Sequence, residues 1–172
     1  NGYGCFVVGE APMMTPKKAL MYVKEGDGME LDMMFHFQHM EADSFMVSWI
    51  PMPFSLKKLK NAYNRWQNKL YGIAWNANYI ENHDQPRIIS RYGSEKYRVE
   101  SGKMLATMYI CQSGTSFIYQ EQESGMLNIK FDSVDQYTDT QVKSTYQLFK
   151  KLGFSDKMCL EVANRASRDN SR

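Results

Sequence analysis

The sequence lacks the features that mark several common classes of protein. No apolar run reaches the roughly 20 residues that a membrane-spanning helix needs. The glycine-rich nucleotide-binding motifs GxGxxG and GxxxxGK(S/T) are also absent. The net charge is only +2, and the lysines and arginines are scattered rather than clustered. We therefore expect no membrane partner, no nucleic-acid partner, no bound metal and no other cofactor.

Cysteine is scarce as well. Cys5, Cys111 and Cys159 are an odd number of cysteines without close spacing, and they stand among apolar residues. This pattern predicts buried, reduced thiols rather than disulfides, and hence a cytoplasmic protein. The sequence has no initiator methionine or signal peptide, and it ends without a turn or an apolar tail. These ends predict that the chain is cut from a longer protein.

The residues that are present are sufficient for one domain with a real core. The chain has 172 residues, of which 43% are hydrophobic. Short apolar runs alternate with amphipathic segments, which predicts alternating strands and helices. The predicted strands are 4–11, 31–40, 74–84 and 115–122, and the predicted helices are 17–26, 53–72, 97–114, 134–153 and 155–167.

Two of these helices have clear signals at their N-termini. Thr15 offers an N-cap immediately before Pro16, which suits the first helical position. Ser55 offers a cap before a stripe of large side chains at helical spacing, namely Leu56, Leu59, Tyr63, Trp66 and Leu70.

The order of elements predicts an α/β fold with parallel strands joined by right-handed crossovers. Two architectures fit this order, an open doubly wound sheet and half of a (β/α)8 barrel. The missing nucleotide-binding motifs weaken the nucleotide-binding form of the open sheet. In both architectures, functional side chains gather at the C-terminal ends of the strands.

All four predicted strands end in polar or acidic residues. These residues are Glu10, then Gln38 and His39, then Asn82, His83 and Asp84, and finally Gln120, Glu121 and Glu123. Glu10 follows an apolar strand, so we expect its carboxyl group to be partly buried, as suits a general acid. Asp84 has a histidine and Arg87 nearby in sequence, which favours its ionised form. Two carboxyl groups in different environments are what glycoside hydrolysis requires.

Several segments together resemble the alpha-amylase family of glycoside hydrolases, in its oligo-1,6-glucosidase branch. VVGEAP, IENHDQPRIISRYG and ASRDNSR are the most specific, and the resemblance covers essentially the whole chain in the right order. It implies an α/β fold that is part of a (β/α)8 TIM barrel, approximately strands 5 to 8 with the following helices. Residues 133–166 would be a helical segment after strand 8. The N-terminal half-barrel and the C-terminal β domain would lie outside residues 1–172.

The resemblance also implies roles for individual residues. Glu10 is similar to the general acid/base, and Asp84 to the carboxylate that stabilises the transition state. His83 and Arg168 resemble residues that contact the sugar, and we expect His39 to line the same site. Arg87 is expected to anchor the loop rather than the substrate. We expect His36 to be packed and not to share an ion with His39, because residues three apart on a strand point to opposite faces.

The implied activity is that of a retaining, exo-acting alpha-glucosidase that hydrolyses α-1,6 bonds of isomalto-oligosaccharides. A trehalose-6-phosphate hydrolase, a dextran glucosidase and a non-catalytic half-barrel module are the alternatives. The family's nucleophile lies in a Gly-Phe-Arg-x-Asp-type stretch, which this sequence lacks. We therefore expect residues 1–172 to be inactive alone, and to self-associate through the open edges of a half-barrel.

Four positions depart from the pattern of the branch. Asn78 stands where leucine is common, Ser116 where proline is usual, Glu121 where glycine is usual, and Ser124 where an aliphatic residue is usual. Glu121 matters most, because a glycine at a strand end often permits a positive φ. These changes count against Gln120 and Glu123 as site residues.

Overall fold

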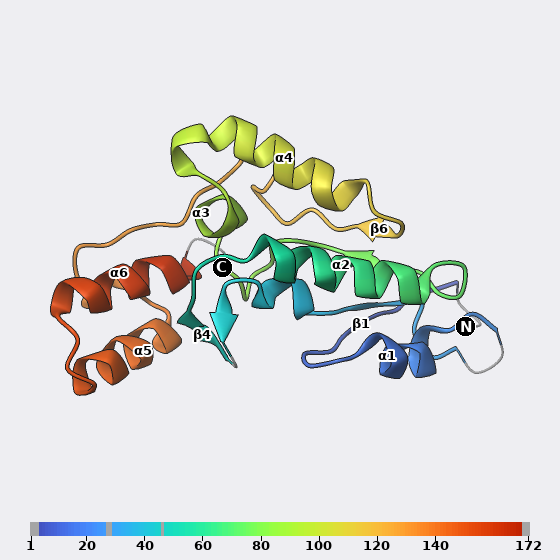
Figure 1. Ribbon diagram of the computed structural model, residues 1–172, viewed down its shortest axis with the longest axis horizontal. Helices are drawn as coiled ribbons and strands as arrows, with labels where there is room; N and C mark the ends of the chain where they lie inside the picture. The colour runs from blue at the N-terminus through green and yellow to red at the C-terminus, as the bar shows by residue number, and fades with distance from the viewer. Residues whose placement is uncertain (1–3, 27–28, 46, 170–172) are drawn as a thin grey trace. The chain divides into compact units, whose positions relative to one another are not determined.

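The computed structural model describes residues 4–26, 29–45 and 47–169 (Figure 1). The chain divides into two compact units. Unit 1 comprises Asn1–Ser48, Met52–Ile80 and Met108–Phe117, and unit 2 comprises Trp49–Pro51, Glu81–Thr107 and Ile118–Arg172. Each unit therefore joins segments that are far apart in the sequence.

Unit 1 begins with the strand–helix–strand motif that the sequence predicts. β1 (Val8–Glu10) pairs in parallel with β2 (Met33–Phe35), and α1 (Pro16–Val23) lies between them in the chain. Thr15 caps α1 as predicted, because its side-chain oxygen accepts a hydrogen bond from the backbone N–H of Lys18. The parallel pairing confirms the predicted α/β character of this part of the chain.

The longest helix, α2 (Leu56–Leu70), supplies much of the core of unit 1. Ser55 caps it as predicted, since its hydroxyl oxygen accepts a hydrogen bond from the Lys58 N–H. Leu56 is 57% exposed, so the buried stripe begins one turn later than predicted, at Leu59. The buried core cluster consists of Ala19, Val23, Met34, Trp66, Leu70 and Ala74.

A second parallel pair in unit 1 joins β5 (Ala77–Asn78) to β6 (Thr115–Ser116). Asn78 lies in a polar network beside this pair, because its Nδ2 donates to the Ser113 carbonyl at 3.1 Å. Gly114 has φ 133°, and a Cβ there would lie 2.5 Å from a backbone oxygen. Only glycine therefore fits at this approach of the two segments.

The strands are shorter than the sequence predicts, and the described residues form three two-stranded sheets without a closed barrel. A strand extends only where neighbouring backbones exchange hydrogen bonds. Phe35 at the end of β2 nevertheless contacts Tyr79 just after β5, with ring centroids 5.2 Å apart. Three unpredicted elements follow β2 in the chain: the 3-10 helix η1 (Gln38–Glu41), β3 (Ser44–Phe45) and β4 (Val47–Pro51).

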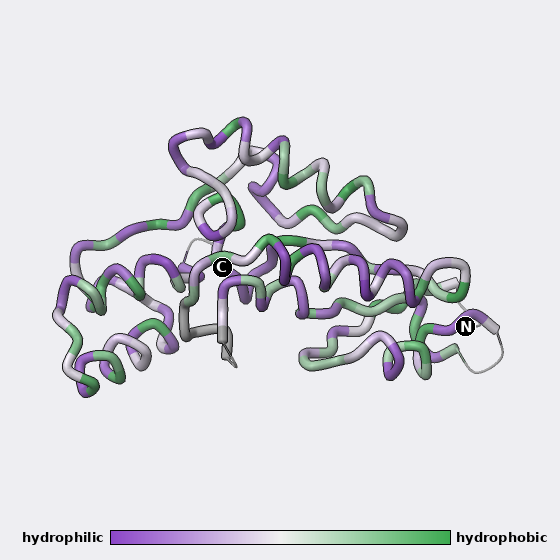
Figure 2. The backbone as a smooth tube through the Cα atoms, in the orientation of Figure 1, coloured by the Kyte–Doolittle hydropathy of each residue, from purple (hydrophilic) through white to green (hydrophobic). Residues whose placement is uncertain are grey.

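Unit 2 is mainly helical. The predicted helices after the fourth strand are present as α5 (Thr140–Lys151) and α6 (Asp156–Ala166), which lie side by side (Figure 1). Their colours alternate between hydrophilic and hydrophobic along each helix (Figure 2), as amphipathic helices require. Tyr137, Val142 and Ala163 form the buried cluster between them. The remaining helical elements are α3 (Ile88–Tyr92), η2 (Glu95–Tyr97), α4 (Arg98–Ile110), which continues into unit 1, and η3 (Val134–Gln136).

The prediction of three buried thiols is wrong for two of them. Cys159 is buried on α6, but Cys5 and Cys111 are exposed. Cys5 precedes β1, and Cys111 follows the last residue of α4, so neither lies inside a packed element. In the part of the chain that the structure describes, no helix is both long enough and apolar enough to cross a membrane.

Glu121 adopts the backbone conformation that its position in the family pattern implies. Its φ is 64°, in the left-handed region that favours glycine. Its carbonyl oxygen accepts hydrogen bonds from the Ser124 hydroxyl at 2.8 Å and from the Met126 N–H at 3.2 Å. The turn therefore keeps its glycine-type geometry although a glutamate occupies it.

Replacing Glu121 by glycine should raise the free energy of unfolding by about 1 kcal/mol, because it removes a Cβ from a left-handed residue. Urea unfolding followed by circular dichroism measures the change. Glu123→Gly is the matched control, since Glu123 is equally exposed and is not among the described residues with positive φ. That variant should lose roughly 0.5–1 kcal/mol. Equal losses in the two variants would contradict the strain at Glu121.

Candidate active site

The predicted motif at residues 80–87 forms a tight turn that presents His83 and Asp84. The Asn82 side-chain oxygen accepts a hydrogen bond from the Asp84 N–H at 2.9 Å, and the Gln85 N–H donates to the Asn82 carbonyl at 3.3 Å. His83 Nε2 lies 3.4 Å from Asp84 Oδ2, and the two side chains are 59% and 37% exposed. The turn therefore holds an imidazole beside a carboxylate where a ligand can reach both.

A buried ion pair joins the two residues that flank this turn. Arg87 Nη1 lies 2.6 Å from Glu81 Oε1, and the two side chains are 1% and 2% exposed. Glu81 Oε2 also accepts the Ile88 N–H at 3.1 Å, and Arg87 Nη1 donates to the Gln120 carbonyl at 2.7 Å. Burial raises the pKa of Glu81 above its ordinary value, although the hydrogen bond from Arg87 opposes the shift. The structure thus agrees with the expectation that Arg87 anchors the loop.

Arg168 lies between two aspartates in unit 2. Its Nη1 is 3.3 Å from Asp84 Oδ1, so the structure brings together two of the predicted site residues that are far apart in sequence. Its Nε and Nη2 donate to the two oxygens of Asp139 at 2.9 and 3.1 Å. The hydrogen bonds with Asp139 raise the pKa of Arg168 further above its ordinary value. The guanidinium is therefore a permanent cation beside Asp84.

Asp139 and Glu81 are the residues that the sequence reasoning missed. Asp139 is buried and caps α5, because its side chain accepts the Gln141 N–H at 2.9 Å. An aspartate just before a helical pattern is a recognisable cap signal. Its bond to Arg168 has no local signal in the sequence. Glu81 belongs to the motif IENHDQPR, but its burial is a tertiary property that the motif does not indicate.

Glu10 lies in unit 1, at the C-terminal end of β1. The expectation that its carboxyl group is partly buried is wrong for this structure, since Glu10 is exposed. Among the described strands, β1 has hydrogen bonds to β2 alone. The role of Glu10 as general acid/base stays a prediction.

His39 and His36 lie together in the interior of unit 1. Their Nδ1 atoms are 3.4 Å apart, so the expectation that they point to opposite faces is wrong. The reason is that His39 belongs to the 3-10 helix η1 rather than to a continuing strand. His36 also stacks on Trp66, with centroids 4.0 Å apart, which confirms that it is packed. His39 is only 1% exposed, so its predicted contact with a sugar would require this packing to open.

At the end of the fourth predicted strand, the backbone rather than the side chains contacts the Glu81–Arg87 pair. The Gln120 carbonyl accepts the bond from Arg87, while the Gln120 and Glu123 side chains are exposed. Within the described ranges, no group of three histidine, cysteine or acidic side chains could hold a metal ion.

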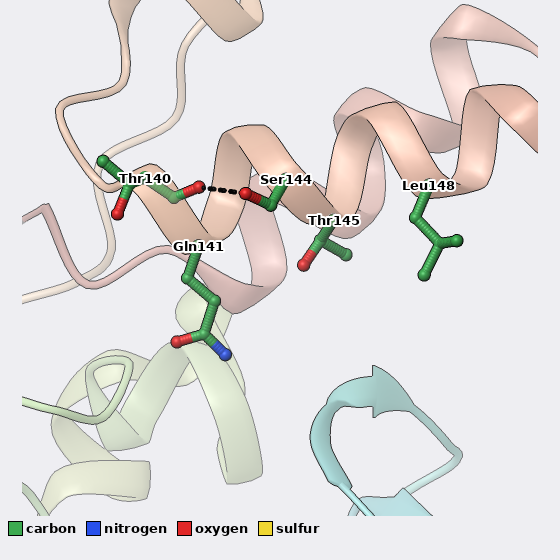
Figure 3. A pocket seen from close by; sticks show the side chains of 5 residues that line it. All are labelled: Thr140, Gln141, Ser144, Thr145 and Leu148. Carbon is green, nitrogen blue, oxygen red and sulfur yellow. Dashed lines mark hydrogen bonds between the residues drawn. The ribbon is translucent and has the colours of Figure 1, made fainter.

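Two surface pockets of unit 2 do not contain the predicted site residues. One has a volume of about 280 Å³ and is lined by α5 alone, where Gln141, Thr145 and Leu148 point to the same side (Figure 3). The other has a volume of about 420 Å³ and is lined by residues of α3, η2, α6 and the segment 128–130. The candidate site is therefore defined by the partly exposed residues around Asp84, which line neither of these two pockets.

Curated relatives identify the class of protein. The chain is 42% identical to the oligo-1,6-glucosidase of Halalkalibacterium halodurans over 172 residues, 40% identical to the trehalose-6-phosphate hydrolase of Bacillus subtilis over 173, and 36% identical to the alpha-glucosidase of Schizosaccharomyces pombe over 179. Each match covers 99% of this chain but only 30–31% of the relative. The chain thus spans about a third of the length of these glycoside hydrolases.

Solved structures agree in fold. The trehalose-6-phosphate hydrolase of Bacillus licheniformis matches with a TM-score of 0.91 and 40% identity, over 99% of this chain and 31% of that one. An isomaltulose synthase mutant from Erwinia rhapontici NX5 matches with a TM-score of 0.88, 28% identity and the same coverage. The family model described as "Alpha amylase, catalytic domain" matches residues 2–172. The chain belongs to the alpha-amylase family.

Breaking the buried pair should destabilise the turn. We expect Arg87→Met to lower the free energy of unfolding by about 3–5 kcal/mol, because it leaves the Glu81 carboxylate buried without its cation. The double variant Glu81→Gln/Arg87→Met should recover part of this loss, as measured by urea unfolding. Lys130→Met is the control, because its pair with Glu95 is solvent-exposed and should change stability by less than about 1 kcal/mol. Similar losses in Arg87→Met and Lys130→Met would contradict the structural role.

The histidine pair should make unit 1 sensitive to acid. Burial, and secondarily the nearby His39, hold the pKa of His36 well below its ordinary value of 6.5. Below pH 6.5 the unfolded chain binds a proton that folded His36 resists, so stability should fall by up to about 1.4 kcal/mol per pH unit. Urea unfolding at pH 7.5 and 5.5 measures this slope. His36→Gln should reduce the slope and His83→Gln, at an exposed site, should keep it, whereas equal slopes in all three proteins would exclude the effect.

Proposed function

We propose that residues 1–172 are the second half of the catalytic (β/α)8 barrel of a retaining, exo-acting alpha-glucosidase. Its substrates would be α-1,6-linked isomalto-oligosaccharides. The observation that carries the proposal is the group in unit 2, where the Asp84 carboxylate lies 3.4 Å from His83 and 3.3 Å from Arg168 on an accessible surface. A carboxylate flanked by donors suits the hydroxyl groups of a glucosyl unit.

The residues would divide the chemistry as follows. Glu10 would protonate the leaving glycosidic oxygen and later take a proton from water. Asp84 would place negative charge beside the oxocarbenium-like transition state. His83 and Arg168 would donate hydrogen bonds to sugar hydroxyls. A role for His39 toward the sugar would require the packing around it in unit 1 to open. The resemblance of their motifs supports these assignments.

The nucleophile would lie outside residues 1–172. The sequence contains no Gly-Phe-Arg-x-Asp stretch, and a retaining mechanism needs an attacking carboxylate. The chain alone would then be inactive. Its short strands, each hydrogen-bonded to one described neighbour, support a tendency to self-associate. A cytoplasmic location also belongs to this proposal, as does the placing of residues 133–166 after strand 8.

A trehalose-6-phosphate hydrolase is the second candidate, because the identities of 42% and 40% to the two kinds of enzyme are too similar to choose between them. A dextran glucosidase fits the same residues. Product analysis with isomaltose, maltose and trehalose 6-phosphate separates these activities. A non-catalytic half-barrel would turn over none of them.

The test is to graft residues 1–172 into the Halalkalibacterium oligo-1,6-glucosidase in place of the matching segment. We expect the graft to hydrolyse nitrophenyl alpha-glucoside, and the isolated chain to show no turnover. Glu10→Gln or Asp84→Asn should lower kcat of the graft by roughly 10²–10⁴-fold, the range of acid–base and electrostatic catalysis. Asp156→Asn, at an exposed ion pair, is the control that should keep full activity. A soluble, folded graft without activity would refute the proposal.

A further inference from the structure

A second buried carboxylate near the candidate site is Asp139, to which the proposed function assigns no part. Its carboxylate accepts hydrogen bonds from the Gln141 N–H at 2.9 Å, from Arg168 Nε at 2.9 Å and from Arg168 Nη2 at 3.1 Å. The Asp139 side chain is only 2% exposed. Aspartate is rarely buried so deeply unless it is paired. Its partner here is Arg168, a residue of the candidate site.

The geometry of the guanidinium explains what this contact does. Asp139 occupies the edge formed by Nε and Nη2, which is the bidentate arrangement that fixes both position and plane. The other terminal nitrogen, Nη1, is thereby aimed at Asp84, 3.3 Å away. The pair with Asp139 is shorter and more buried than the pair with Asp84, whose side chain is 37% exposed. Asp139 therefore dominates the orientation of Arg168.

A second contact fixes the same segments to each other. The Thr138 N–H donates to Asp169 Oδ1 at 2.7 Å, immediately beside the Asp139–Arg168 pair. Asp139 is also the N-cap of the 12-residue helix α5. Thr138 and Asp139, just before α5, thus bind Asp169 and Arg168, just after Ser167. The orientation of Arg168 is set by the start of a helix, which is a rigid reference point.

We propose that Asp139 is a positioning residue, which clamps the Arg168 guanidinium so that Nη1 faces Asp84 and the bound glucosyl unit. This inference rests on the proposed function for the role of Arg168 toward the sugar. The clamp itself is a property of unit 2 and exists without substrate. Asp139 does not touch the substrate in this assignment and acts only through Arg168.

A purely structural role as a helix cap predicts something different. Asparagine caps helices about as well as aspartate, because its side-chain oxygen accepts the same backbone N–H. Asparagine cannot provide two negatively charged oxygens to a guanidinium edge. Asp139→Asn therefore keeps the oxygen that caps α5, and loses the negative charge and the second oxygen that accepts Arg168 Nε. The bidentate clamp is broken while the cap remains, which separates the two roles within one substitution.

The first experiment uses the 172-residue chain and proton–nitrogen NMR of the Arg168 Nε–H. In Asp139→Asn we expect its exchange with water to accelerate by about tenfold or more, because a charge-assisted buried bond is lost. Asp156→Asn is the matched control, since it removes an aspartate from an exposed pair with Lys150 and should leave the Arg168 signal unchanged. An unchanged Arg168 exchange rate in Asp139→Asn would overturn the clamp.

The second experiment uses the grafted enzyme described above. Asp139→Asn should lower kcat/KM by about tenfold, the effect of losing one oriented charged contact. Adding Asp139→Asn to Arg168→Lys should cause little further loss, because lysine cannot use the bidentate edge. Fully multiplicative losses, or a kcat/KM unaffected by Asp139→Asn, would refute the positioning role. An inactive parent graft would refute the proposed function instead, and the NMR experiment would still decide the clamp.

Discussion

The buried ion pair between Glu81 and Arg87 is the interaction on which the candidate site depends. Its two residues flank His83 and Asp84 in the chain, and the pair also binds the Ile88 N–H and the Gln120 carbonyl. Glu81, the start of α3 and the loop near residue 120 are thereby joined at one charged centre. Two unpaired charges at this depth would be very costly, so the loop geometry is set by the need to keep them together.

Arg87 and Arg168 show how burial divides one chemistry into two roles. Both guanidinium groups form short bonds to a buried carboxylate, Glu81 in one case and Asp139 in the other. Arg87 is 1% exposed and donates its hydrogen bonds to buried groups of the protein. Arg168 is 17% exposed and lies beside the accessible carboxylate of Asp84. The first arrangement stabilises a turn, and the second offers an oriented cation at a surface.

The interior of unit 1 is held by aromatic stacking rather than by charge. Trp66 stacks on His36, which contacts His39, and His39 in turn contacts Tyr79. A neutral imidazole suits such a cluster, because burial disfavours its charged form. Unit 1 thus relies on a deprotonated histidine, whereas the turn in unit 2 relies on a buried ion pair.

The sequence by itself determined the five longer helices, the caps at Thr15 and Ser55, the parallel pairing and the membership of the alpha-amylase family, because these depend on neighbours within a few residues or on motifs. It missed the short helices η1 and α3. Only the tertiary structure decided that Glu10 is exposed, that His39 is enclosed beside His36, and that Asp139 holds Arg168 against Asp84. The strand lengths could not be predicted from the sequence, because a strand extends only where a distant segment supplies hydrogen-bond partners. The bonds from Arg168 to Asp139 and to Asp84 join residues 29 and 84 positions apart. No local sequence pattern indicates contacts over such separations.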